Sequence, residues 1–150
     1  MTKQLRMADL SQATDEQHFG LGEVHVDPDG RHWEYVQADG AITAGHACIV
    51  SSAGQADALN TTNDGSVGGK IGIADHAFAD NQYGFLFRGF GLIEAVVANS
   101  VAAGTAMTTT ANDGIIGTGG VAIQGLSNVD AGVTSTRVTC YAASLMSVNV

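Results

Sequence analysis

The sequence predicts an all-β fold: a small, tulip-like β-barrel or β-sandwich built of two pseudo-repeated halves. Three observations support this prediction. Glycine accounts for 20 of the 150 residues and proline for one, which favours short strands joined by tight turns. Residues 40–150 contain no sustained helical period, and the same strand pattern occurs there twice. The length suits one domain, 40–150, preceded by an arm, 1–19, and a hairpin, 20–39.

Residues 1–19 are expected to form an extended arm rather than a helix. Leu5, Leu10 and Phe19 are spaced too loosely to form one apolar helix face. Terminal arms are commonly ordered only when something docks them. Two interpretations remain: a frayed tail, or an arm that docks on a partner through Leu5, Arg6, Leu10 and Phe19.

Residues 20–39 are predicted to form a β-hairpin. Glu23–Val26 and His32–Val36 have strand character, and Asp27-Pro28-Asp29-Gly30 between them has the composition of a tight turn. Trp33 and Tyr35 then alternate onto one face of the hairpin. They either cover part of the core or form an exposed binding patch.

The rest of the chain contains further strand candidates, separated by glycine- and asparagine-rich segments. The longest of these segments, Ser52–Gly68, is expected to be a surface loop because Asn and Gly supply left-handed backbone positions. The candidate strands are 46–52, 70–74, 83–90, 92–98, 105–111, 121–126 and 135–142.

Three matches in the same order indicate an internal repeat. Residues 44–51 match 103–110 at an offset of 59, and 69–73 match the segment from Gly119 or Gly120 to Ile123 at an offset of about 50. Residues 85–88 match 136–139 at an offset of 51. Two copies of one strand arrangement are the simplest physical explanation.

The charge argues against two broad classes of partner. The formal net charge is −9, and the six basic residues are scattered, so no basic patch is available for nucleic acid. No apolar run approaches the ~20 residues that a membrane-spanning helix needs. We therefore expect no nucleic-acid partner and no membrane. The two cysteines, Cys48 and Cys140, are too few for a disulfide scaffold and are expected to be buried thiols of a cytoplasmically made protein.

Charge is also unevenly distributed along the chain. Residues 1–40 contain eight of the fifteen acidic residues, whereas from Val96 onward only Asp113, Asp130 and Arg137 are charged. Such a segment either faces another protein subunit or forms an uncharged, solvated Thr/Ser surface. We favour the buried interface.

No residue constellation predicts a metal site or a cofactor. His25 and His32 lie on opposite arms of the hairpin, where one register would place them face to face, but two ligands do not make a site. Asp27 and Asp29 lack the following oxygen ligands of a calcium loop. We therefore expect no metal and no cofactor.

A catalytic site is likewise not expected. Cys48 and His46 share one face of a strand, but no oxyanion hole or orienting third group accompanies them. A small β-barrel hydrolase that uses this pair is the least favoured of the alternatives, and we expect no enzymatic activity.

The run GKIGIADHAFADNQYGFLFRGFG (69–91) and the segment IQGLSNVDAGVTSTRVTCY (123–141), together with the repeated Ala-Gly turns, resemble the capsid decoration, or cement, proteins of tailed bacteriophages. The resemblance covers residues 40–142. It implies a β-rich homotrimer on the outer surface of the virion head, where it bridges major capsid protein subunits and stabilises the expanded shell. It carries no catalytic residues over. The alternative is a virion module that binds host carbohydrate through Trp33 and Tyr35 on an exposed hairpin.

Overall fold

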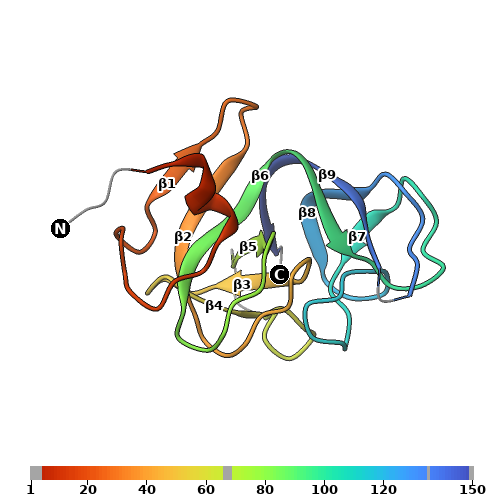
Figure 1. Cartoon of the computed structure of the whole chain (residues 1–150). Coiled ribbons are helices and arrows are strands. Elements are labelled where there is room, and N and C mark those ends of the chain that lie inside the picture. The colour runs from red at the N-terminus through yellow and green to blue at the C-terminus, as the bar shows by residue number, and fades with distance from the viewer. Residues whose placement is uncertain (1–4, 66–68, 135, 149–150) are drawn as a thin grey trace.

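The computed structural model describes residues 5–65, 69–134 and 136–148, and it is all-β, as predicted (Figure 1). Apart from one short 3-10 helix, the regular structure in these residues consists of strands in one sheet. The elements are η1 (Met7–Ser11), β1 (Val24–Val26), β2 (His32–Ala38), β3 (Ala47–Val50), β4 (Gln55–Ala58), β5 (Lys70–Ile73), β6 (Tyr83–Val96), β7 (Ala106–Thr108), β8 (Ala122–Asn128) and β9 (Arg137–Val148).

The sheet closes on itself in a barrel-like ring. Its strand order is β1-β2-β4-β3-β5-β6-β9-β8-β7, and two further pairings, β2–β6 and β5–β9, close it. Strand β6 pairs with β2 along its first half and with β9 along its second half. Figure 1 shows β6 passing from the lobe that holds β1–β5 to the lobe that holds β7 and β8. This one strand therefore joins the two parts of the molecule.

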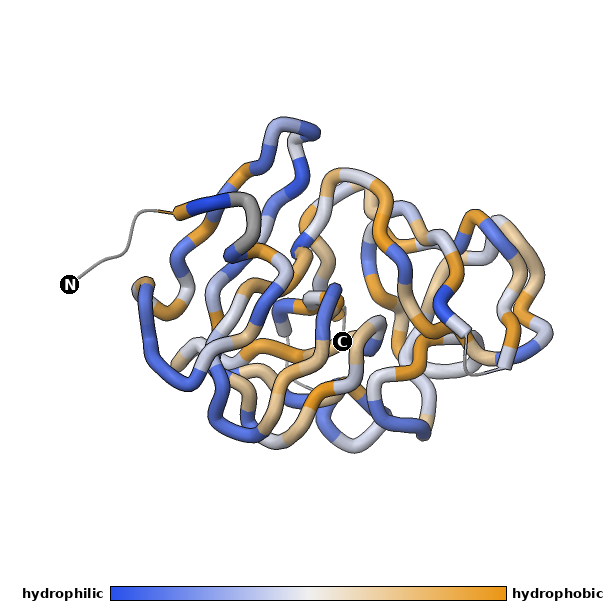
Figure 2. The backbone as a smooth tube through the Cα atoms, in the orientation of Figure 1, coloured by the Kyte–Doolittle hydropathy of each residue, from blue (hydrophilic) through white to orange (hydrophobic). Residues whose placement is uncertain are grey.

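The predicted hairpin is confirmed, but its register differs from the one that would pair the two histidines. Across β1 and β2, His25 faces Trp33 and Val26 faces His32. Successive strand residues point to opposite faces, so this register places His25 and His32 on opposite sides. The turn from Asp27 to Gly30 is strongly hydrophilic (Figure 2).

Strand β6 is one strand of 14 residues, not the two that the sequence predicts at 83–90 and 92–98. The predicted break falls at Gly89-Phe90-Gly91, where the register with β9 shifts. A Cβ atom on Gly89 would collide with the main-chain carbonyl of Ser144 in β9. The glycine therefore marks a close approach of two strands within a bulge, rather than the end of a strand.

Strand β4 was missed, because it lies inside the segment Ser52–Gly68 that is expected to be a loop. Its sequence, Gln-Ala-Asp-Ala, has low intrinsic strand propensity. Pairing on both sides compensates: β4 is antiparallel to β3 and parallel to the end of β2. Tertiary context, not local sequence, creates this strand.

The registers confirm that the chain contains two copies of one arrangement. Gln37 faces Tyr83 across β2 and β6, and Val96 faces Arg137 across β6 and β9. The first members of these pairs are 59 positions apart and the second members 54. The offset of 59 is therefore correct, whereas the offset of 51 predicted for residues 85–88 is too small by three. At the start of β8, where Ala122 faces Thr108 as Ile71 faces Ile49, the offset is 51, close to the predicted value of about 50. The register shifts of β8 against β7 and β9 account for the change from 51 to 54.

The second half of β6 plays the part in the second copy that β2 plays in the first. Likewise β7 corresponds to β3, β8 to β5, and β9 to the first half of β6. The counterpart of β4 is reduced to bridges: Ile116 lies parallel to Val97, and Gly117 lies antiparallel to Thr108. The two copies thus share topology even where sequence similarity is lost.

The interior contains two buried clusters. The smaller lies within the first copy and includes Cys48, Phe78 and Leu86. The larger spans both copies and also takes in Leu10 and Phe19 from the N-terminal arm. The arm is therefore part of the folded unit.

Arg88 holds together the point where β5, β6 and β9 meet. Its Nη1 donates to the carbonyl oxygens of Ile71 in β5 and Met146 in β9, each at 2.8 Å. Its Nε lies 3.6 Å from Oε1 of Glu34, whose Oε2 accepts a hydrogen bond from Lys70 Nζ at 2.9 Å. Both Arg88 and Glu34 are buried. A buried guanidinium is tolerated because it is paired and hydrogen-bonded.

Replacing Arg88 by Met should destabilise the protein by about 3–5 kcal/mol, because it leaves a buried carboxylate with less compensation and two carbonyls without a donor. Urea unfolding measures the loss. Arg6→Met, at a side chain that is largely exposed, is the matched control and should change stability by less than about 0.5 kcal/mol. Equal effects of the two variants would contradict this account of Arg88.

Candidate interaction surface

Trp33 and Tyr35 are buried, each only 2% exposed, so of their two interpretations the one in which they cover part of the core is correct and the exposed aromatic platform is wrong. They lie on the outer face of the pair formed by β2 and the first half of β6, where Trp33 faces Phe87 and Tyr35 faces Phe85. The N-terminal arm covers this face. The ring centroid of Phe19 lies 5.2 Å from that of Tyr35 and 5.4 Å from that of Phe85. Neither ring is free to stack on a sugar.

Asp27 fixes the hairpin onto this aromatic cluster. Its buried carboxylate accepts hydrogen bonds from Trp33 Nε1 at 3.0 Å and from Arg31 Nε at 2.9 Å, and also from the main-chain amides of Asp29 and Arg31. Burial alone would raise the pKa of Asp27, but the hydrogen bonds from Trp33 and Arg31 outweigh it and hold the pKa below the ordinary value of 3.8. Asp27 is therefore a structural carboxylate.

The arm residues predicted to dock on a partner are instead held mainly by their own chain. Leu10 and Phe19 are buried in the larger cluster, and Leu5 packs against it partly exposed. Arg6 is exposed and lies 3.7 Å from the carboxylate of Asp9. Apolar side chains that are free to fold back onto their own core do so, which is why the expectation that Leu10 and Phe19 await a partner is wrong.

Main-chain bonds also fix the arm: Thr14 and Tyr83 exchange two N–H···O bonds at 2.9 Å. The amide of His18 donates to the phenolic oxygen of Tyr35 at 3.0 Å. The arm is thus docked along most of its described length, without any second chain.

The equivalent outer face of the second copy is uncovered. By the internal repeat, Leu92 corresponds to Trp33 and Tyr141 to Phe87, and Leu92 faces Tyr141 across β6 and β9. Leu92 is 54% exposed and Tyr141 46%. The first copy buries this face beneath the arm, whereas the second copy presents it to solvent.

Two further large apolar side chains are exposed on the same two strands. Phe90 and Leu145 are also exposed, and the Phe90 ring centroid lies 4.8 Å from that of His32. We call Phe90, Leu92, Tyr141 and Leu145 the outer apolar face. Large apolar side chains exposed on adjacent strands are candidates for an interaction site.

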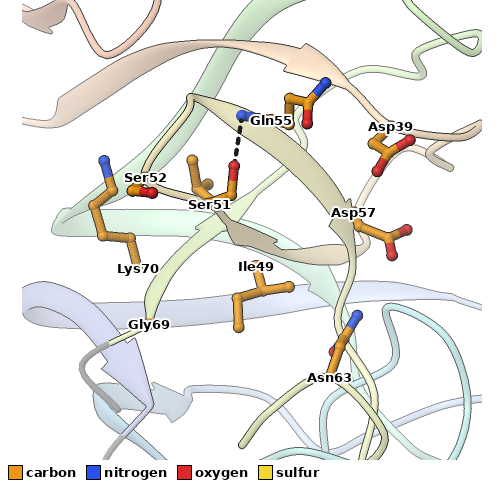
Figure 3. A pocket seen from close by; sticks show the side chains of 10 residues that line it. Asp39, Ile49, Ser51, Ser52, Gln55, Asp57, Asn63, Gly69 and Lys70 are labelled. Carbon is orange, nitrogen blue, oxygen red and sulfur yellow. Dashed lines mark hydrogen bonds between the residues drawn. The ribbon is translucent and has the colours of Figure 1, made fainter. Parts of the chain in front are cut away.

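A hollow of about 760 Å³ lies against β3 and β4 (Figure 3). Asp39 and Asp57 lie at one end and Lys70 at the other, with Ile49 between them. The main-chain amide of Gln55 donates to the Ser51 hydroxyl at 3.2 Å, and Lys70 is paired with Glu34. The serine and the lysine therefore serve the fold.

The Cys48 and His46 pair does not have the geometry of a nucleophile and its base. The Cys48 thiol is completely buried, and its contact with His46 is to the main-chain oxygen at 3.8 Å. Burial raises the pKa of Cys48 and, to about 11, that of Cys140. A reactive cysteine requires the opposite shift.

Among residues 5–65, 69–134 and 136–148, no three His, Cys, Asp or Glu side chains lie close enough together to hold a metal ion. The same residues contain no helix long and apolar enough to cross a membrane. Comparison of the chain with protein-family models and with curated proteins finds no match.

Sequence reasoning missed the outer apolar face, although a signal was present. The correct repeat offsets place Leu92 at the position of Trp33 and Tyr141 at that of Phe87. The predicted offset of 59 already relates Leu92 to Trp33. The equivalence of Tyr141 and Phe87 needs the strand registers, because the third predicted match is displaced by three residues.

Replacing Asp27 by Asn should cost about 1–3 kcal/mol at pH 7, because the charged acceptor for Trp33 and Arg31 is lost. A carboxyl whose pKa is lowered by folding stabilises the protein above its unfolded pKa, and that contribution disappears as the pH falls through the folded value. The difference in unfolding free energy between variant and parent should therefore shrink as the pH falls below about 4.

The emission of Trp33, the one tryptophan in the sequence, follows urea unfolding at each pH. Asp29→Asn, at an exposed side chain in the same turn, is the control and should match the parent. A cost that stays constant from pH 7 to pH 2 would disprove this role for the Asp27 charge.

Proposed function

We propose that this protein is a structural component of a tailed-bacteriophage virion. It binds the exterior of the head as a homotrimer and bridges major capsid protein subunits, so that it stabilises the expanded shell. The resemblance of residues 69–91 and 123–141 to capsid decoration proteins supports this function.

The observation that carries the proposal is the outer apolar face on β6 and β9, next to the charge-poor last third of the chain. Phe90, Leu92, Tyr141 and Leu145 are exposed on adjacent strands. From Val96 onward only three residues are charged. A surface poor in charge and rich in large apolar side chains has the composition of a permanent interface core. Burial against other subunits is the physical use of such a face.

The mechanism is mass action on the assembled shell. A protein that binds the joints between capsid subunits in the expanded lattice, but not free subunits, stabilises the lattice by RT ln(1 + [L]/Kd) at each site. Many sites per head add these contributions together. The acidic first 40 residues suit an exterior position, away from the phosphates of the packaged genome.

The arm contributes to this function through the fold. Since Leu10 and Phe19 are buried in their own chain, the arm covers the aromatic face of the first copy. That leaves the second copy's face open for contacts between subunits of the decorated shell.

Purified heads that lack the protein, incubated with it and sedimented, should retain it at a fixed ratio to the major capsid protein. Decorated heads should also resist higher temperature before releasing DNA, because bound protein shifts the equilibrium toward the intact shell. Tyr141→Asp, which places a charge in the outer apolar face, should lower head occupancy at least tenfold.

Val133→Asp is the control, because Val133 is equally exposed but lies outside the strands. It should bind like the parent. Absence of the parent protein from sedimented heads under all conditions would reject the proposed function.

A further inference from the structure

The internal repeat shows a strand position that is filled in the first copy and open in the second. In the first copy β1 lies along the edge of β2, where His25 pairs with Trp33 and the Tyr35 amide donates to the carbonyl of Glu23 at 2.9 Å. The counterparts of Trp33 and Tyr35 are Leu92 and Glu94. No strand lies along that edge of Leu92 and Glu94 in the described part of the chain.

Side chains, rather than a strand, reach the carbonyls of this open edge. Arg31 Nη1 lies 3.5 Å from the Leu92 oxygen, at the limit of a hydrogen bond, and Arg137 donates to the Glu94 oxygen at 3.0 and 3.2 Å. Within residues 5–65, 69–134 and 136–148, the amides of Leu92 and Glu94 have no main-chain acceptor on this side. A hollow of about 290 Å³ adjoins the edge, lined by Arg31, Asp75, Leu92, Ile93, Glu94 and Thr139.

The chain has a second, different open edge on β1. The amide of Tyr35 bonds to the carbonyl of Glu23, and that of Asp27 bonds to the carbonyl of Arg31. In an antiparallel pair, hydrogen-bonding residues alternate with residues that face away. The main-chain groups of Val24 and Val26 therefore face away from β2. Their side chains are also exposed.

We propose that β1 of a second copy of this chain pairs, antiparallel, with the open edge of β6, so that Val26 lies beside Leu92 and Val24 beside Glu94. The precedent is internal, because β1 itself occupies the equivalent edge of β2. Main-chain bonds supply the affinity of such strand addition. Val26 then covers Leu92 and Tyr141, the exposed pair of the outer apolar face.

The geometry of this contact determines the kind of assembly. The edge of β1 and the edge of β6 belong to different parts of the chain, and each copy has both. The β1 edge of one copy therefore contacts the β6 edge of the next, which is a head-to-tail arrangement. Head-to-tail contacts close into a ring when the rotation between neighbouring copies closes, and otherwise form an open filament. A ring of three is the homotrimer of the proposed function, on whose assembly step this inference rests. A contact between identical edges would give a two-fold dimer instead.

Cysteine substitution tests the register. Residues opposite each other at a hydrogen-bonded antiparallel position have Cα atoms about 5.5 Å apart, within the range that a disulfide spans. An equimolar mixture of Val26→Cys and Leu92→Cys chains should form a covalent dimer on mild oxidation. Val133→Cys mixed with Leu92→Cys should not. The native Cys48 and Cys140 are buried and do not compete.

Charge substitution tests the head-to-tail geometry. The parent should sediment as a closed ring, and Val26→Asp and Leu92→Asp should each fall to the mass of the single 15.3 kDa chain. Mixing these two variants should give a dimer of twice that mass, because each retains the edge that the other lacks. Both substitutions are at exposed side chains, so far-ultraviolet circular dichroism should remain that of the parent.

A parent that is monomeric at 100 μM, or variant mixtures that stay monomeric, would overturn this inference. So would disruption of the assembly by Val133→Asp to the same extent. Head binding is measured separately. If the protein forms the ring but does not bind heads, the proposed function is wrong and the edge contact stands. If the protein is monomeric but binds heads, the edge contact is wrong and the proposed function stands.

Discussion

The fold depends on one buried guanidinium. Arg88 stands where β5, β6 and β9 meet, and its bonds to Ile71 and Met146 replace the ladder bonds that three diverging strands cannot make to one another. Glu34 from β2 and Lys70 from β5 complete the charge balance. Because β6 belongs to both copies of the repeat, this junction fixes the position of one copy relative to the other. Buried polar groups constrain geometry more strongly than apolar contacts, since an unsatisfied partner is costly.

The two copies share a topology but differ in what covers them. The first has the arm and β1 over its outer face and edge, and it carries aromatic side chains there. Within the residues that the structure describes, the second has neither covering segment, and it carries Leu92, Glu94, Thr139 and Tyr141 at the equivalent positions. In one copy of the duplicated unit, a segment of the same chain covers the outer face, and the covered side chains join the core. The other copy retains an open face, on which assembly with further chains can be built.

The sequence predicts the fold class well and the surface poorly, for physical reasons. The turn at Asp27–Gly30 and strands such as β2 and β5 follow from local turn chemistry and β-branched or aromatic content. Strand β4 has no such local signal and exists because β2 and β3 flank it. Trp33 and Leu92 are equivalent in the repeat, yet one is buried and the other exposed. That contrast depends on where the arm lies, which no local pattern encodes.

The position of Met146 also has a consequence for how the chain acquires its structure. The contact between Arg88 and the Met146 carbonyl joins residues 58 positions apart, whereas that to Ile71 spans 17. Until β9 pairs with β6, the Arg88 guanidinium lacks one of its carbonyl acceptors and one side of the buried cluster is exposed to solvent. Contacts of long sequence separation slow folding, because loop-closure entropy is lost before they form. We therefore expect the barrel to close late in folding, and the first copy to gain its full stability only when the second is in place.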